Sequence, residues 1–427
     1  MRVGHEAKAV WQMRSTLIAA ICVVMLVGAA LTGADRPRVQ SVAAAPQLFA
    51  SVPQAAVTAI APPEFNLHAK SGILMDAASG SVFYEFNADT PLPPASITKI
   101  MTLLLGVEAV ERGDAKLTDL VTASDYAVSM GGAQIWLEPG ESMPLGEILN
   151  ALAVGSANDA AVALAEHLAG TKEAFVDEMN AKAQALGMKA THFVNPSGLP
   201  PSSLGESGEH VMSARDIAVL SRYAMRYKMF RNLVGQYGPL TMRPETKKQP
   251  ILYNFNRMLA TYDGMDGIKT GFTNESGYSI SASATRQNLR LIAVVMGAPS
   301  AKVRNADVAS LLNWGFAHYR AAQVAAAGKT VAQIDVRKGK QRSVPLLAAD
   351  DLNVTRAKGD KQEITTEIAA PKALVAPVKK GQAVGELIAK VGDQEVGRVP
   401  LIAGEDIERA GMLQIIWNSL TKILGRN

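Results

Sequence analysis

The spacing of hydrophobic residues predicts the first folded elements of the chain. HAKSGILMDA, residues 68–77, and SVFYEFNAD, residues 81–89, are strand-like stretches on either side of the turn residues 78–80, so we predict two strands joined by that turn. Helical spacing, with an apolar residue every three or four positions, follows in three segments: 96–112, 144–155 and 158–170. We therefore expect a hairpin followed by helices.

Strand patterns return in the middle of the chain. Three short stretches separated by turn residues predict an antiparallel meander at 264–273, 277–286 and 289–298. Helical spacing over 306–325 then predicts a helix that closes this unit. A hairpin, helices and a meander in this order indicate an α+β domain with helices packed against an antiparallel sheet, which we place at 66–328.

The pattern changes again beyond this domain. Short alternating stretches from about Val331 to Gly404 predict a small all-β domain, which we place at 329–404. Residues 405–427 follow helical spacing, with Trp417 and aliphatic residues on one stripe and basic residues off it. We expect this amphipathic helix to anchor the chain in a membrane interface, with docking onto the β domain or dimerisation as the alternative.

The N-terminal residues have the pattern of an export signal. Arg2, Lys8 and Arg14 precede the uncharged segment Ser15–Ala34, so we assign residues 1–34 as a signal peptide, or as an uncleaved signal anchor because the segment could just span a bilayer. Residues 35–65 are rich in Ala and Pro, which predicts a linker.

Composition narrows the possible partners and compartments. The 427 residues are 48% apolar and 19% charged, enough for a sizeable core and two globular units. The 43 basic and 39 acidic residues are interspersed and give a net charge of +4, which makes nucleic acid an unlikely partner.

The cysteine and histidine content of the chain argues against several kinds of catalytic and metal-binding site. The single cysteine, Cys22, lies inside the predicted signal, so a mature chain would hold no disulfide, no thiolate metal site and no cysteine nucleophile. The six histidines show no H-x-x-x-H spacing. We expect no metal and no cofactor.

The stretch PASITKIMT, residues 94–102, places Lys99 one helical turn after Ser96 and directly before an apolar run. Side chains three apart on a helix share a face, and a lysine whose pKa is lowered by desolvation can take the proton of a serine nucleophile. Ser96 near a helix start would also lie where free N–H groups favour negative charge. The simpler interpretation is a capping serine with a lysine that extends to solvent.

Two further patterns complete a set of three. GSAND, residues 155–159, places Ser156 and Asn158 between two helical segments, where either could also be an ordinary N-cap. Lys269, Thr270 and Gly271 form K-T-G on a predicted strand, where the glycine lets a ligand lie against the strand and the other two side chains can hold a carboxylate. Alone, this lysine could simply be an exposed residue before a turn.

In this order, S-x-x-K, S-x-N and K-T-G form the motif set of penicillin-binding proteins and serine β-lactamases. The chain resembles the low-molecular-mass penicillin-binding proteins that act as D-alanyl-D-alanine carboxypeptidases, over roughly residues 65–425. The surrounding stretches are similar too: PPASITKIMT, GSANDAAVALAEH, FVNPSGL, SARDIA and DGMDGIKTGFTNESGYSISASATR. The resemblance implies the penicillin-binding or β-lactamase-like transpeptidase fold, followed by the family's β domain and membrane anchor.

The resemblance also implies a role for each motif residue. Ser96 would attack the carbonyl between the last two D-alanines of a peptidoglycan stem peptide and form an acyl-enzyme, while Lys99 accepts its proton. Ser156 would relay a proton to the leaving amine, and Asn158 would orient Lys99 and the substrate amide. Lys269 and Thr270 would bind the terminal carboxylate, and Gly271 would belong to the same substrate-binding site.

Two further positions follow from the same resemblance. Arg304 stands at the family's spacing before Trp314-Gly315-Phe316 and would be a second partner of the carboxylate; the simpler interpretation is an exposed arginine at a helix start. The oxyanion hole would use the backbone N–H groups of Ser96 and Phe272. Many relatives have His at the position of Phe272, which leaves substrate preference and deacylation rate open.

The predicted activity is a serine-type D-Ala-D-Ala carboxypeptidase that binds β-lactams covalently, on the periplasmic face of a bacterial inner membrane, in cell-wall biogenesis and cell-shape maintenance. A β-lactamase, a D,D-endopeptidase or a silent wall-binding scaffold are the alternatives. Glu147 to Asn150 imitate the E-x-L-N piece of class A β-lactamases but precede Ser156, which argues against efficient deacylation of penicillin. The intact motif residues argue against the scaffold.

Overall fold

The structure is a computed structural model of the chain that describes residues 57, 60–246 and 249–411. These residues belong to one compact unit, Val52–Asn427, and the other unit, Met1–Ser51, lies outside them. The predicted signal at 1–34 and most of the predicted linker therefore fall outside the described residues. Within the described part of the chain, no helix is long and apolar enough to cross a membrane.

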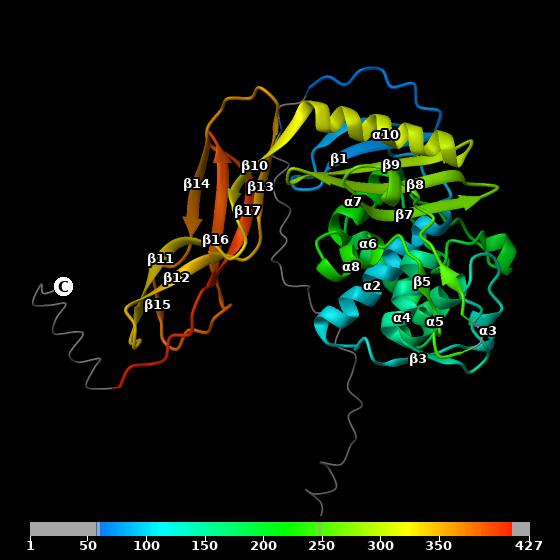
Figure 1. The fold of residues 1–427 in the computed structure, drawn as a ribbon, viewed down its shortest axis with the longest axis horizontal. Coiled ribbons are helices and arrows are strands. Elements are labelled where there is room, and N and C mark those ends of the chain that lie inside the picture. Colours follow the sequence, from blue (N-terminus) through cyan, green and yellow to red (C-terminus); the bar gives the residue numbers. More distant parts are fainter. Residues whose placement is uncertain (1–56, 58–59, 247–248, 412–427) are drawn as a thin grey trace, which may run out of the picture. The chain divides into compact units, whose positions relative to one another are not determined.

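A five-stranded antiparallel sheet organises the first domain (Figure 1). Its strands, in spatial order, are β2 (Val82–Phe86), β1 (Ser71–Asp76), β9 (Leu289–Ala298), β8 (Gly277–Arg286) and β7 (Met265–Thr273). β1 and β2 form the predicted hairpin, and β7 to β9 form the predicted meander. β7 is an edge strand, so its outer side is open to other parts of the chain or to a ligand.

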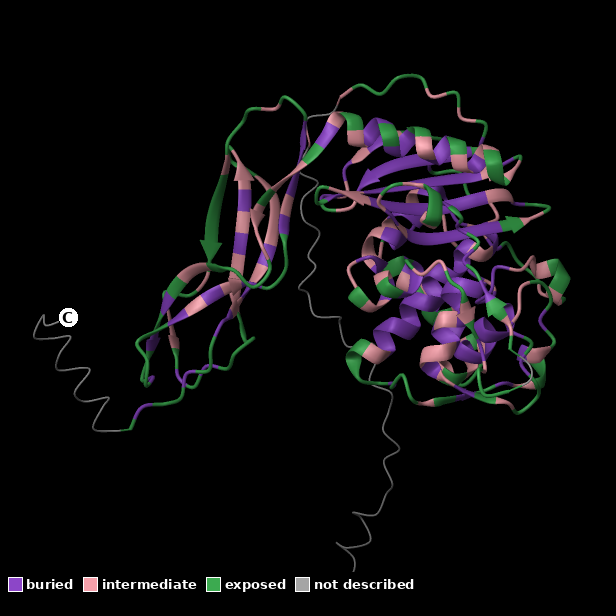
Figure 2. Ribbon diagram, in the orientation of Figure 1, coloured by how far each residue is buried: buried purple, intermediate pink, exposed green. Residues whose placement is uncertain are grey.

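Both faces of this sheet are buried, as the colours of its strands in Figure 2 show. Neighbouring residues point to opposite faces, so Ile73 joins one hydrophobic core and Leu74 the other. The core on the side of Leu74 is closed by α10 (Ala301–His318), which Figure 1 shows along one face of the sheet. The opposite face is covered by a helical layer.

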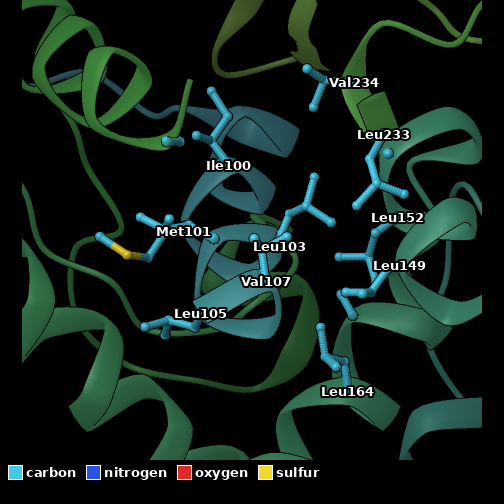
Figure 3. Close-up of a cluster of buried hydrophobic side chains, with 14 of the residues drawn as sticks. Ile100, Met101, Leu103, Leu105, Val107, Leu149, Leu152, Leu164, Leu233 and Val234 are labelled. Carbon is cyan, nitrogen blue, oxygen red and sulfur yellow. The ribbon is translucent and has the colours of Figure 1, made fainter. Parts of the chain in front are cut away.

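The helical layer surrounds α2 (Lys99–Arg112), which is buried along most of its length. Figure 3 shows Leu103 and Val107 of α2 among side chains of its neighbours, including Leu149 and Leu164. The other helices are α3 (Asp125–Val128), α4 (Leu145–Asn150), a π-helix (Ala151–Gly155), α5 (Asn158–Ala169), α6 (Lys172–Ala185), α7 (Ala214–Ala224), α8 (Lys228–Val234) and α9 (Met258–Thr261). Two small two-stranded sheets pair β3 (Leu120–Thr122) with β4 (Ser142–Pro144) and β5 (Leu240–Thr241) with β6 (Ile251–Leu252).

The helix predicted at 306–325 is wrong at both ends. It starts earlier, at Ala301, because Ser300 Oγ accepts the Val303 N–H at 3.2 Å and caps it. It stops at His318, and β10 (Tyr319–Ala325) follows as a strand paired with β13 (Leu352–Ala357). The Tyr319 ring is buried and stacks on Phe83 at 3.8 Å, so tertiary packing overrides the helix propensity of this alanine-rich stretch.

The remaining C-terminal residues form the predicted all-β domain. Its six-stranded sheet has the order β14 (Ile364–Ala369), β16 (Ala383–Val391), β17 (Gln394–Ala403), β12 (Ser343–Ala348), β11 (Thr330–Arg337) and β15 (Ala373–Val375). The predicted helix at 405–427 is wrong over 405–411, where the chain is extended and Ile407 and Arg409 bridge to Val378 and Gly339. Ile407 is buried in the β core, which fixes this segment against the sheet. The rest of that prediction lies outside the described residues.

Candidate active site

The structure brings Ser96 and Lys99 together at the start of α2. Ser96 lies in a 3₁₀ turn, Ala95–Thr98, and Lys99 is the first residue of α2, with 1% of its surface exposed. The Lys99 Nζ lies 3.2 Å from Ser96 Oγ. Ala95 has a φ of 49°, in the left-handed region that costs an alanine free energy, so the turn that presents the serine is held by its surroundings.

Two oxygens hold the amine of Lys99 from other parts of the chain. Its Nζ donates to Asn158 Oδ1 and to the backbone carbonyl of Ser197, each at 2.6 Å. Asn158 is the first residue of α5, and its own Nδ2 donates to the Gly131 carbonyl at 2.6 Å. The side chain of Asn158 is therefore fixed at both ends, and it fixes Lys99 in turn.

The environment of Lys99 favours the neutral amine. Burial holds its pKa well below the usual range, the positive charge of Lys269 lowers the pKa further, and Asp159 acts in the opposite direction. Asp159 is itself buried and accepts the backbone N–H groups of Ile135 and Leu137, so much of its charge is already satisfied. A lysine kept neutral beside a serine hydroxyl can act as a general base.

Ser156 closes the second motif at the junction predicted from sequence. It ends the π-helix with a φ of 56°, immediately before α5, and only 3% of its surface is exposed. Gly155, directly before Ser156, packs on Leu252, and a Cβ at this position would lie 2.8 Å from Leu252 Cδ1. Ser156 Oγ makes no hydrogen bond with any residue that the structure describes, which leaves it available to a substrate.

The third motif lies on the edge strand β7, against the turn that carries Ser96. A Cβ on Gly271 would lie 2.6 Å from the Pro94 carbonyl oxygen and 3.2 Å from Ile97 N. Only glycine therefore lets β7 approach the turn of Ser96 this closely. The side chains of Lys269 and Thr270 are buried, whereas Phe272 is 49% exposed and its ring packs on Tyr278 at 4.3 Å.

Lys269 and Arg304 form a buried pair of positive charges. Burial lowers the pKa of Lys269 to about 7, with a further contribution from Arg304, and burial lowers the pKa of Arg304 to about 10. Arg304 is only 5% exposed, so it is not the exposed arginine of the simpler interpretation. Among the described residues neither cation has a carboxylate partner: Lys269 Nζ donates to the Thr270 carbonyl, and Arg304 to Asn305 Oδ1. The two charges are arranged for an external anion.

Sequence reasoning missed the loop that closes the site. The Ser197 carbonyl binds Lys99, and Gly198 has a φ of 79°, with the position of a Cβ only 1.9 Å from the Ala95 carbonyl oxygen. In the sequence, FVNPSGL indicates only a resemblance to the family and no contact with Lys99. A backbone carbonyl leaves no mark on residue type, so only the glycine could have indicated this contact.

Comparison with known proteins agrees with this geometry. Residues 56–300 match the family model described as "Peptidase_S11: D-alanyl-D-alanine carboxypeptidase", and residues 319–409 match "Penicillin-binding protein 5, C-terminal domain". The chain belongs to the D-alanyl-D-alanine carboxypeptidase family. The predicted family and fold, a penicillin-binding-protein fold with a C-terminal all-β domain, are confirmed.

Individual members of this carboxypeptidase family are similar along most of the chain. The D-alanyl-D-alanine carboxypeptidase DacF of Bacillus subtilis is 40% identical over 354 residues, which are 83% of this chain and 89% of the relative. The solved structure of penicillin binding protein 5 from Haemophilus influenzae has a TM-score of 0.60 at 31% identity. The match covers 82% of this chain and 100% of the chain in that structure. Penicillin-binding protein D2 from Listeria monocytogenes, in its ampicillin-bound form, has a TM-score of 0.52 at 30% identity and covers 60% of this chain and 100% of its own.

Proposed function

We propose that this protein is a serine-type D-Ala-D-Ala carboxypeptidase that removes the terminal D-alanine from peptidoglycan stem pentapeptides. The observation that carries the proposal is the position of Lys99 Nζ between Ser96 Oγ, Asn158 Oδ1 and the Ser197 carbonyl. A neutral amine has two N–H groups and one lone pair. Asn158 and Ser197 accept the two N–H groups, so the lone pair is left for the hydroxyl of Ser96.

Acylation begins when Ser96 Oγ attacks the carbonyl carbon between the two D-alanines and its proton moves to Lys99 Nζ. The backbone N–H groups of Ser96 and Phe272 stabilise the oxyanion, because Gly271 lets β7 lie against the turn of Ser96. The C–N bond then breaks as Ser156 gives its hydroxyl proton to the leaving D-alanine amine and receives in exchange the proton that Lys99 took from Ser96. Water hydrolyses the ester and restores Ser96.

The terminal carboxylate of the substrate binds at Lys269, Thr270 and Arg304. Two buried cations without a carboxylate partner among the described residues support this assignment, since an anion between them removes their mutual repulsion. The hydroxyl of Thr270 adds a neutral donor. A β-lactam carries a carboxylate and a strained amide in a similar arrangement, so we expect penicillin to acylate Ser96, as the ampicillin-bound Listeria relative suggests.

Export and membrane attachment are part of the proposal. Ser15–Ala34 supports export across the inner membrane, and the apolar stripe from Leu413 to Leu424 supports contact with its outer face, in the periplasm. The division into a catalytic domain at 66–328 and a β domain at 329–404 is likewise proposed. Deleting residues 412–427 and measuring the protein in the membrane fraction tests the C-terminal contact; a deletion variant that stays bound would favour an N-terminal anchor.

The activity is tested with a pentapeptide that ends in D-Ala-D-Ala. We expect the wild-type protein to release free D-alanine and Ser96→Ala to release none, with both variants equally folded by circular dichroism. Release by Ser96→Ala at the wild-type rate would contradict the assignment of the nucleophile. Absence of release from the wild type would contradict the carboxypeptidase function.

A further inference from the structure

The Ser197 carbonyl that accepts the Lys99 amine belongs to a loop ordered by one buried side chain. Asn195 is 1% exposed, and its Oδ1 accepts the backbone N–H groups of Ser197 at 3.2 Å and of Gly198 at 2.8 Å. The hydroxyl of Ser197 donates to the same oxygen at 3.0 Å. One amide oxygen therefore holds the N–H groups on both sides of the Ser197 carbonyl.

The hydrogen bond to Gly198 determines where the Ser197 carbonyl points. The Ser197 C=O and the Gly198 N–H belong to one trans peptide, in which these two groups point in opposite directions. Because the N–H points to Asn195 Oδ1, the carbonyl points away from Asn195, and its oxygen lies 2.6 Å from Lys99 Nζ. Asn195 thus aims this carbonyl at the general base.

A carboxylate sets which way the amide of Asn195 faces. Its Nδ2 donates to the Leu199 carbonyl and to Glu206 Oε2, each at 3.1 Å. Both partners can only accept, so they bind the NH₂ group and leave Oδ1 facing the loop. Glu206 is itself held in an ion pair with Lys172, the first residue of α6, and both side chains are mostly buried. The direction of the Ser197 carbonyl therefore depends on an ion pair outside the reacting groups.

We propose that Asn195 and Glu206 are positioning residues for the general base, which aim the Ser197 carbonyl at Lys99 and so keep the lone pair of the amine on Ser96. The proposal rests on the carboxypeptidase function and adds two residues to its machinery. When the carbonyl turns away, one N–H of Lys99 loses its acceptor, and the lone pair is no longer fixed toward the Ser96 hydroxyl.

The effect should be confined to the chemical step. Thr102 Oγ1 donates to the Pro196 carbonyl at 2.6 Å, so the loop stays on α2 and only the peptide between residues 197 and 198 turns. The proposed carboxylate site at Lys269 and Arg304 makes no hydrogen bond to Asn195 or Glu206 within the described residues. We therefore expect changes in this network to lower kcat and to leave KM nearly unchanged.

Exchanging the donor and the acceptor of one hydrogen bond tests the proposal. Asn195→Asp keeps an oxygen for the loop but loses the donor to Glu206 and brings two carboxylates together. We expect kcat for D-alanine release to fall about tenfold, the effect of one lost hydrogen bond, with KM within about twofold of wild type. When Glu206→Gln is added to Asn195→Asp, the new amide donates to the new carboxylate, and kcat should recover to within about threefold of wild type.

Asn180→Asp is the matched control, since it removes the same kind of donor from the same layer. Asn180 Nδ2 donates to the Phe193 carbonyl and its Oδ1 accepts the Phe193 N–H, each at 2.9 Å. This variant should melt at a lower temperature in circular dichroism but keep kcat within about twofold of wild type. Wild-type kcat in Asn195→Asp would overturn the proposal, as would a double variant that regains the melting temperature without regaining kcat.

Two surface variants repeat the test if Asn195→Asp does not fold. Glu206 and Glu173 both bind Lys172, but only Glu206 binds Asn195. We expect kcat to fall about threefold in Glu206→Ala and to stay at the wild-type value in Glu173→Ala, and equal kcat values in the two would overturn the proposal. Release of D-alanine by the wild type keeps the carboxypeptidase function intact in each of these cases. Absence of release by the wild type would overturn that function, and the inference with it.

Discussion

Gly271 lets β7 lie directly against the turn that carries Ser96, and replacing it with alanine tests whether this close packing is required. Its φ lies outside the left-handed region, so the backbone itself accepts an alanine. The new Cβ would lie 2.6 Å from the Pro94 carbonyl oxygen, where ordinary contacts begin at 3.4 Å. Because the obstacle is backbone, it cannot rotate away, and β7 must move from the 3₁₀ turn by about 0.8 Å, the difference between these two distances.

A shift of this size would separate the proposed oxyanion hole and the proposed carboxylate site from Ser96. Misplacement of reacting groups by about 1 Å lowers rates by about 100-fold, so we expect kcat/KM for D-alanine release to fall by about that factor in Gly271→Ala. Penicillin acylation, followed with a fluorescent derivative, should slow in parallel. Thermal unfolding measured by circular dichroism shows whether the variant remains folded.

Gly146→Ala is the matched control. Its Cβ would lie 3.4 Å from the Leu117 carbonyl oxygen and 3.6 Å from Leu117 Cβ, which are ordinary contacts. Alanine also suits the α-helix α4 better than glycine, by about 1 kcal/mol. We expect this variant to keep wild-type kcat/KM. A Gly271→Ala protein with kcat/KM within about twofold of wild type would refute the argument that close approach of β7 is required.

Three further predictions follow from groups around the site. Because the pKa of Lys269 is about 7, its positive charge is lost as pH rises through this value, and kcat/KM for a carboxylate substrate should fall. Lys269→Arg should move this fall to higher pH. Identical pH profiles of the two proteins would contradict the role of Lys269 in binding the carboxylate. Asp159→Asn removes a negative charge that raises the pKa of Lys99 and replaces one of the two oxygens that accept backbone N–H groups with an N–H donor. Urea unfolding should therefore show a loss of about 1–3 kcal/mol, and an unchanged midpoint would count against this role. His210→Ala leaves Thr98 Oγ1 without its buried partner and should lower the melting temperature. His210→Gln keeps a donor and an acceptor and should recover part of this loss. Equal melting temperatures of the two variants would argue against a stabilising hydrogen bond between His210 and Thr98.

Local sequence patterns were sufficient to predict the elements whose structure depends on residues close together in the sequence. The strands β1, β2 and β7 to β9 could be predicted because each is a short run of strand-forming residues bounded by turn residues. Residues 319–325 failed because alanine favours a helix, while the strand there is fixed by pairing with β13 and by the stacking of Tyr319 on Phe83. Such long-range contacts are not encoded in a local window.

The candidate site also has a part that could be predicted from the sequence and a part that could not. Motif spacing identified Ser96, Lys99 and Asn158, whose side chains the structure joins by hydrogen bonds. The contribution of Ser197 could not be found because it is a main-chain carbonyl, and any residue type supplies one. The burial of Arg304 was equally hidden, since it depends on how α10 packs against the sheet.

The proposed reaction depends most on a neutral Lys99 that activates Ser96. Intact-protein mass spectrometry after a timed incubation with benzylpenicillin measures this directly, in the wild type, Ser96→Ala and Lys99→Met, which keeps the length of the side chain without the amine. We predict one adduct with the mass of intact penicillin on wild type, located by proteolysis to Ser96, none on Ser96→Ala, and acylation at least about 100-fold slower in Lys99→Met. An adduct on Ser96→Ala, or wild-type acylation of Lys99→Met, would contradict the account.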